Sequence, residues 1–225
     1  MFQAGRLLLS RPACSVRPLP RPSARRTVCS AAMQMLSPPE LAAQRAVISI
    51  EDAFSIDQVN LYDRLGLDAL KKLATEFYDR VYADTEDAHF RSVFANSPKA
   101  VAIKNNYEFM AQRLGGPPLY SQRKGHPALP RRHAPFDCSE ATAERYMQHM
   151  DAALAAVPEI DEDSRRRLHA YFRHTCYFLL VAQELRESMQ RQAAAAAAAG
   201  GGTTAAPTAE QKQAVVQQPL PPGHP

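Results

Sequence analysis

The chain has 225 residues, of which 22% are charged, and a formal net charge of +4 at neutral pH. No run of residues approaches the roughly 18 apolar positions of a membrane-spanning helix, so a membrane protein is not expected. The positive charge lies in the six arginines of residues 1–32, because the rest of the chain carries 21 basic side chains (27 less 6) against 23 acidic ones. A slightly negative folded part offers no basic surface for nucleic acid.

The first 40 residues have the composition of an organelle transit peptide. Residues 1–39 contain no Asp or Glu but six Arg, together with several Ser and Ala, and this bias is typical of such segments. The LLL at 7–9 is too short for the apolar region of a secretory signal. We therefore expect residues 1–40 to be a disordered transit peptide, followed by an N-terminal extension over 41–56. A plastid is favoured as the destination; the alternatives are a mitochondrion, or the cytoplasm if the segment is not a transit peptide.

Helical periodicity begins in the next segment and indicates one domain over residues 57–188. In 67–84, apolar side chains recur every three or four positions on one face, with lysines on the opposite face. The apolar face comprises Leu70, Leu73, Phe77, Tyr78 and Val81. A second helix is expected from about 99 to 114, where the Gly-Gly-Pro-Pro sequence that follows ends it.

The segment 115–137 is expected to be irregular, because it holds five of the seven prolines of the folded part. A third helix should start after Ser139, a suitable N-cap, and end at Pro158. A fourth helix is expected over 161–188. The domain shows no alternating strand pattern of useful length, so the sequence predicts an all-α fold with four main helices.

The C-terminal residues 189–225 form an Ala-, Gly- and Pro-rich tail of low complexity. Such a segment has too little apolar side-chain area to offset the entropy lost on ordering. We expect a disordered tail, in which the alanines of 193–199 can extend the fourth helix by one or two turns.

A histidine in the proline-rich segment is a candidate metal ligand. His133 lies in GHPALPRRHAPF (125–136), where Pro127, Pro130 and Pro135 exclude one long helix. Neutral imidazole binds iron, zinc or copper through one ring nitrogen. A single histidine is more often a satisfied polar residue than a ligand, so both interpretations stay open at this point.

Three polar side chains interrupt the apolar helix faces. Tyr78 lies in the first predicted helix, Asn106 in the second and Tyr146 in the third. A buried hydroxyl or amide without a partner costs about 1–3 kcal/mol, so each should have one. Singly, each fits a satisfied polar group of the core; together they suggest a polar-lined pocket inside an apolar core.

The run YEFMAQRLGGPPLYSQRKGHPALPRRHAPF (107–136) closely resembles the group II truncated haemoglobins, in particular their plant and algal branch. The pieces GGPPLYSQR, GHPAL and RHAPF occur in order at matching spacing, and the similarity extends from near 54 to 185. The resemblance implies a two-over-two helical sandwich around one haem b. It also implies that the histidine of RHAPF, His133, binds the iron.

The resemblance also assigns residues to the opposite, distal side of the haem. Tyr78 would donate a hydrogen bond to bound O2, Ala102 would leave space near the ligand, and Asn106 could add a second donor. Phe94 would pack against the haem edge. The family usually has Trp at the position of Tyr146, and this chain has no Trp. Phenol is a shorter donor than indole and is also an acceptor, so direct contact between Tyr146 and the ligand stays open.

Haem propionates need cations or hydrogen-bond donors at the mouth of the pocket. Tyr120, Arg123, Lys124 and Arg132 lie in the segment where the resemblance places these contacts. Solvated surface charge is the alternative interpretation for each of them.

The resemblance implies a globin that reversibly binds O2, and also NO and CO, at a five-coordinate iron. NO scavenging and peroxide chemistry stay open, and turnover as a dioxygenase needs an external reductase, because the chain has no flavin or nicotinamide domain. The alternative is a haem-free globin-fold interaction or sensor module, although such a protein has no reason to keep His133, Tyr78 and Phe94. The oligomeric state is not readable from the sequence.

Overall fold

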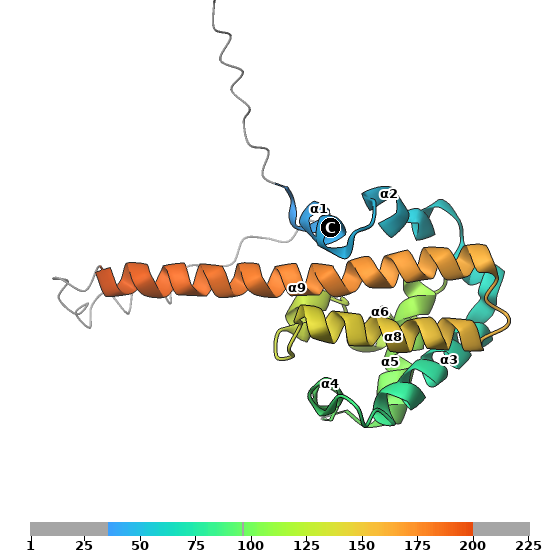
Figure 1. The fold of residues 1–225 in the computed structure, drawn as a ribbon. Coiled ribbons are helices and arrows are strands. Elements are labelled where there is room, and N and C mark those ends of the chain that lie inside the picture. Colours follow the sequence, from blue (N-terminus) through green and yellow to red (C-terminus); the bar gives the residue numbers. More distant parts are fainter. Residues whose placement is uncertain (1–35, 96, 200–225) are drawn as a thin grey trace, which may run out of the picture. The chain divides into compact units, whose positions relative to one another are not determined.

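The computed structural model describes residues 36–95 and 97–199 (Figure 1). Every regular element in these ranges is a helix, in the order α1 to α9, with the 3₁₀ helix η1 between α2 and α3. The predicted transit peptide up to residue 35, and the tail from residue 200, lie outside the described residues. None of the described helices combines the length and the apolar character needed to cross a membrane. The predicted all-α class is confirmed.

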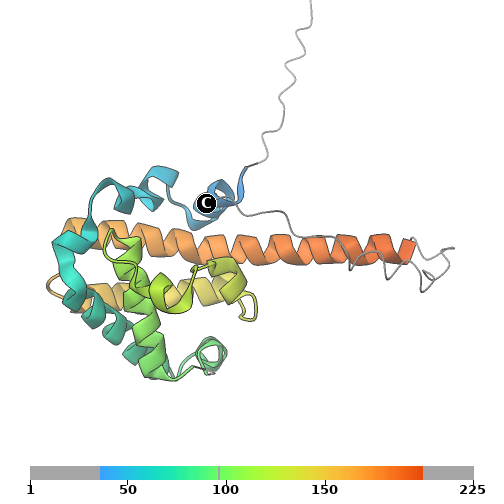
Figure 2. The same ribbon diagram turned by 180° about the vertical axis from the view of Figure 1, so that it is seen from behind.

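Four long helices build the domain: α3 (Leu61–Tyr82), α5 (Lys99–Arg113), α8 (Glu140–Ala156) and α9 (Glu162–Ala199). Helix α3 packs against both α5 and α8, and α8 packs against α9. The pairs α3/α5 and α8/α9 therefore form the two layers of a two-over-two arrangement, which can be followed from both sides in Figures 1 and 2.

The core lies between these four helices. The predicted apolar face of α3 is buried at Leu70, Leu73, Phe77 and Val81, while Tyr78 is half-buried. Each of these apolar side chains contributes about 1.5–3 kcal/mol relative to an exposed position. The facing side chains are Met110 of α5, Leu114 directly after α5, Met147, Met150 and Leu154 of α8, and Leu168, Tyr171 and Phe172 of α9.

The ends of the long helices follow local chemistry. Ser139 caps α8 as predicted, because its hydroxyl accepts a hydrogen bond from the backbone N–H of Thr142. Helix α3 starts earlier than predicted, since the side chain of Asn60 caps it by accepting from the N–H of Asp63. Gly66, with φ of 75°, interrupts α3 just before the predicted start at residue 67.

The N-terminal boundary of the prediction is wrong. Helix α1 (Pro38–Ala46) begins inside the segment expected to be a disordered transit peptide, and the extension 41–56 holds the rest of α1 and α2 (Ile50–Ala53). Ser37 and Glu40 form a capping box at the start of α1. Alanines of α1 are buried against Tyr177, Leu180 and Val181 of α9, so α1 is part of the folded unit. The short η1 (Ser55–Gln58) leads into α3.

The prediction of a disordered tail is wrong for residues 189–192, while the expected extension of the fourth helix by the alanines of 193–199 is confirmed. Helix α9 continues to Ala199, well beyond the predicted end at 188. Alanine has the highest intrinsic helix propensity, so the tract 193–199 propagates a helix that is already nucleated and packed.

The proline-rich segment 115–137 contains two short helices, α6 (Leu119–Lys124) and α7 (Leu129–His133). Another short helix, α4 (Ala88–Val93), follows α3 and is capped by the side chain of Asp87. Short helices of this kind were not expected, because a single turn offers too few positions for a periodic pattern.

The turn after α5 provides a test of the packing. A Cβ atom at Gly116 would lie 2.4 Å from the ring of Tyr62, so Gly116→Ala must displace that ring. We expect this variant to lower the free energy of unfolding by about 2 kcal/mol, measured by urea denaturation. In a chain that already carries Tyr62→Ala, the same Gly116→Ala change should cost much less, because the obstructing ring is gone. An equal loss of unfolding free energy in both backgrounds would contradict a steric cause at Gly116.

Candidate functional site

His133 is the last residue of α7, a single helical turn that begins at Leu129 and has Pro130 as its second residue. Its Nδ1 lies 2.8 Å from the carbonyl oxygen of Leu129. A carbonyl only accepts, so Nδ1 must carry the proton and Nε2 must carry the lone pair. Burial lowers the pKa of His133 below its usual value, which favours the neutral ring. Neutral imidazole with one fixed N–H and one available lone pair is the form that ligates a metal.

The turn around His133 is held by two arginines. Arg132 donates from Nε to the carbonyl of Pro127 (2.8 Å) and from Nη2 to the carbonyls of Lys124 (2.8 Å) and His126 (3.1 Å). Arg186 of α9 donates to the carbonyl of Ala134 at 3.0 Å. These bonds satisfy backbone groups that the prolines leave without helical partners, and they position the segment that carries the imidazole.

The predicted distal residues lie on α3 and α5. The ring of Tyr78 packs against Phe77 (centroids 5.0 Å apart) and Phe94 (6.1 Å). Burial raises the pKa of Tyr78 to about 12, while the nearby amide of Asn106 acts in the opposite direction. The phenol is therefore protonated at neutral pH and can donate. Oδ1 of Asn106 is buried and has no hydrogen-bond partner among the described residues.

Three further predicted residues border this group. Ala102 is buried one turn before Asn106 on α5. Phe94 follows α4, and its carbonyl accepts from the hydroxyl of Tyr82 at 3.1 Å. Tyr146 of α8 packs on Phe77 with ring centroids 4.6 Å apart, and burial raises its pKa well above the usual value. The structure thus brings Tyr78, Phe94 and Asn106 together, with Tyr146 nearby through its packing on Phe77.

The four residues predicted to contact the haem propionates differ in their burial and in their partners within the chain. Tyr120 is buried beneath the guanidinium of Arg132, 5.6 Å from its ring centroid. Arg123 donates from Nε to Glu108 at 2.8 Å, so much of its charge is paired within the chain. Lys124 is exposed. The four propionate contacts remain predictions. Arg132 also bonds to backbone carbonyls of the turn before His133.

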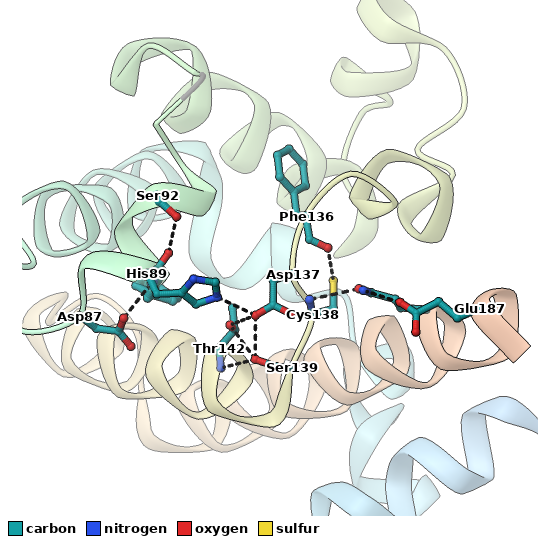
Figure 3. A network of polar contacts seen from close by, with 11 residues as sticks. Asp87, His89, Ser92, Phe136, Asp137, Cys138, Ser139, Thr142 and Glu187 are labelled. Carbon is teal, nitrogen blue, oxygen red and sulfur yellow. Dashed lines mark hydrogen bonds and ion pairs between the residues drawn. The ribbon is translucent and has the colours of Figure 1, made fainter.

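A polar network beside the His133 segment was missed by the sequence analysis (Figure 3). Nε2 of His89, on α4, lies 2.9 Å from a carboxylate oxygen of Asp137, which also accepts from the hydroxyls of Ser139 and Thr142. The contact with His89 lowers the pKa of Asp137 and raises that of His89. It joins the helix before Phe94 to the loop after His133, two segments that border the candidate site.

A second network, centred on a buried carboxylate, fixes the end of α3. The side chain of Asp84 is fully buried and accepts two bonds from Arg145 (2.7 and 2.8 Å) and one contact from Nε2 of His149 (2.7 Å). Backbone N–H groups of Glu86 and Asp87 add two more. The Arg145 guanidinium, together with these donors, holds the pKa of Asp84 far below its usual range.

Asp84→Asn should destabilise the fold by about 3 kcal/mol, because it leaves Arg145 partly unpaired in a buried site. The folded-state pKa is depressed, so the stabilisation is present above the unfolded pKa of about 3.9 and is lost as pH falls further. The difference in free energy of unfolding between wild type and variant, measured by urea denaturation, should therefore become smaller below about pH 4. Asp79→Asn removes an exposed pair with Lys99 and should cost less than about 1 kcal/mol. A difference in unfolding free energy that does not change with pH would contradict an ionised carboxylate at Asp84.

The donor set fits a haem better than a bare metal ion. The described residues contain no cluster of three or more His, Cys, Asp or Glu side chains that could hold an ion. One oriented imidazole suffices for haem iron, because the porphyrin supplies the other ligands. No hydrogen bond or ring contact joins His133 to Tyr78 or Asn106 among the described residues. The protonated phenol of Tyr78 can donate a hydrogen bond and therefore suits the side of a haem on which a polar ligand binds.

Comparison with known proteins gives the same family. The family model "Bacterial-like globin" matches residues 60–178. The chain is 51% identical over 140 residues to "Two-on-two hemoglobin-3" of Arabidopsis thaliana, covering 62% of this chain and 79% of that protein. It is 47% identical over 147 residues to "Group 2 truncated hemoglobin 3-1" of Lotus japonicus, covering 65% and 87% respectively.

A solved structure shows the same fold. The group II 2-on-2 hemoglobin of Agrobacterium tumefaciens superposes with a TM-score of 0.50 at 24% identity, covering 54% of this chain and 93% of that one. The residues matched by the family model include the predicted site residues Tyr78, Phe94, Ala102, Asn106, His133 and Tyr146. The chain belongs to the group 2 truncated haemoglobins and is a haem-binding globin.

Proposed function

We propose that the protein reversibly binds O2, and at the same site NO and CO, on a five-coordinate haem b held by His133. One observation carries the proposal: Nδ1 of His133 is engaged by the Leu129 carbonyl at 2.8 Å, so Nε2 is the free ligating nitrogen. The low pKa of this ring keeps Nε2 unprotonated at neutral pH. The relatives named above are hemoglobins, which supports the assignment.

A bound haem, held by His133, would supply an iron that binds a diatomic gas. The residues of this chain decide how tightly the gas is held. We assign to Tyr78 the donation of a hydrogen bond to the partly negative O2, because its buried phenol keeps its proton. Asn106 lies next to it and offers a second polar group. A hydrogen bond to a charged acceptor contributes about 1.5–3 kcal/mol.

The apolar surroundings of this pocket support its role. Phe77 and Phe94 pack on the ring of Tyr78 and shield part of it from water, and a hydrogen bond is stronger where water does not compete. Ala102 leaves room for a small ligand one turn from Asn106. We assign the haem edge to Phe94 and the propionates to Tyr120, Arg123, Lys124 and Arg132, as the resemblance implies.

Turnover chemistry needs partners outside this chain. NO scavenging and peroxide reduction both consume electrons, so either role requires an external reductase. The Arg-rich, acid-poor composition of residues 1–35 supports a location in the plastid.

Cycling between O2 and argon tests the proposal. The full chain, loaded with haem and reduced, should change its visible absorption spectrum when O2 is added and return to the first spectrum when O2 is removed. Irreversible oxidation at the first exposure to O2 would contradict reversible binding. An apoprotein that takes up no added haem would favour a haem-free interaction module.

A further inference from the structure

The loop that follows His133 has too little regular structure to keep its own shape. Helix α7 ends at His133 after a single turn, and residues 134–139 connect it to α8. A single helical turn is marginal by itself, because nucleation of a helix is unfavourable and one turn adds few hydrogen bonds. The orientation of the imidazole must therefore depend on contacts that the rest of the domain makes with this loop.

Helix α9 contacts both ends of the loop. Nη2 of Arg186 donates to the carbonyl of Ala134, the residue after His133, at 3.0 Å. Oε1 of Gln183 accepts from the backbone N–H of Cys138 at 3.1 Å. Gln183 and Arg186 are three residues apart, so they project from the same side of the helix. We call these two side chains the α9 clamp, because their bonds fix the loop at its first and fifth residues.

A further residue of α9 orients one half of the clamp. Nε2 of Gln183 donates to Oε1 of Glu187, one turn along the helix, at 3.0 Å. This bond uses the donor end of the amide, so the acceptor end is left to face the N–H of Cys138. Figure 3 shows this run of contacts from Cys138 to Glu187. The other half of the clamp is a charged donor, and hydrogen bonds from charged donors are stronger than those between neutral groups.

Between the two fixed ends of the loop, Phe136 meets the imidazole. The rings of Phe136 and His133 lie edge to face, with centroids 6.2 Å apart. The backbone N–H of Phe136 also donates to the carbonyl of His133 at 3.0 Å. At Nδ1 the same ring contacts the Leu129 carbonyl. A displaced loop would therefore change the orientation of the ring as well as the path of the backbone.

The two clamp residues lie outside the part of the chain that the family model matches. That match ends at residue 178, whereas α9 continues to Ala199. The match therefore gives Gln183 and Arg186 no role. On the other side of His133, Arg132 bonds only to carbonyls of its own segment among the described residues. The later turns of α9 thus attach the end of α7 to the long helices of the domain.

We propose that Arg186, together with Gln183, is a positioning residue for the iron ligand. Through the loop 134–138, the α9 clamp fixes the orientation of the His133 imidazole, and with it the strength of the bond between Nε2 and the haem iron. This inference rests on the proposed ligation of the iron by His133 and names the residues that control it. Groups that orient a metal ligand typically contribute 10- to 100-fold to the retention of the metal.

Arg186→Met tests the clamp with little disturbance of α9. Methionine keeps a long apolar side chain and a high helix propensity, but it donates no hydrogen bond. In the reduced, ligand-free, full-length protein, resonance Raman spectroscopy should show an iron–histidine stretching band that is broader and lower in frequency than in the wild type. Transfer of haem from the variant to an excess of apomyoglobin should become about 10-fold faster.

Three further variants separate the donated bond from other effects. Arg186→Lys keeps a charged donor and should return both the band and the haem-loss rate towards the wild type. Arg166→Met makes the same substitution on α9 at an exposed arginine paired with Asp163, and it should change neither. Gln183→Leu removes the acceptor of the other clamp bond and should move both measurements in the same direction as Arg186→Met.

The possible results distinguish the clamp from the ligation on which it rests. A wild-type band that keeps its frequency and width in Arg186→Met and in Gln183→Leu, with unchanged haem-loss rates, overturns the proposal and leaves ligation by His133 intact. An equal change in Arg166→Met, or a variant Arg186→Lys as perturbed as Arg186→Met, also overturns it, because the donated bond would then not be the cause. A wild type without the band contradicts ligation by His133 and the role of the clamp together.

Discussion

His133→Gly is expected to release the haem. The ring nitrogen of His133 is the one protein ligand that we assign to the iron, and loss even of a residue that only orients a metal ligand costs 10- to 100-fold in affinity. Removal of the ligand itself should therefore speed haem loss by at least about 100-fold. The measurement is the rate of haem transfer from the variant to an excess of apomyoglobin.

Free imidazole separates ligation from folding in this variant. Glycine leaves a space of the size of the lost ring, so added imidazole should enter it and slow haem loss towards the wild-type rate. His126→Ala removes a nearby exposed histidine and should leave haem retention unchanged. Equal retention by wild type and His133→Gly would show that another residue holds the haem. Loss without rescue, together with an unfolded far-UV spectrum, would point to a structural role for His133.

Tyr78→Phe is expected to speed O2 dissociation by roughly 10- to 150-fold. This range corresponds to the 1.5–3 kcal/mol of one hydrogen bond to a charged acceptor. The substitution removes only the hydroxyl and keeps the ring that packs on Phe77 and Phe94. Stopped-flow mixing of the oxygenated protein with an O2 scavenger measures the rate.

Tyr62→Phe is the matched control for this change. Tyr62 lies near the start of α3, beside Gly116, and is separated from Tyr78 by the break at Gly66 and three helical turns. Loss of the Tyr62 hydroxyl should leave the O2 dissociation rate unchanged. An unchanged rate in Tyr78→Phe would remove the distal role of Tyr78, and the neighbouring amide of Asn106 would then be the remaining donor on that side.

Helical periodicity located the four long helices because each buries one continuous face. The stripe Leu70, Leu73, Phe77 and Val81 is readable at a period of 3.6 and is buried as expected. Periodicity did not predict helix α1, because this helix buries small alanines that form no apolar stripe. The extension of α9 through the alanines of 193–199 was predicted from their composition and not from periodicity, because these residues bury no apolar face.

Contacts between distant residues could not be read from the sequence at all. Asp84 meets Arg145 and His149, which lie 61 and 65 residues away, and no local pattern links them. The Leu129 carbonyl is different, because it lies four residues before His133, at the spacing of a helical hydrogen bond. That acceptor could have been found if Pro130 had been recognised as compatible with the first turn of a short helix.

The iron–histidine stretching vibration of the reduced protein, observed by resonance Raman spectroscopy, tests the central assignment most directly. The account predicts such a band in the ferrous, ligand-free wild type, and its disappearance in His133→Gly until imidazole is supplied. A wild type without the band, or a variant that keeps it without imidazole, would contradict ligation by His133.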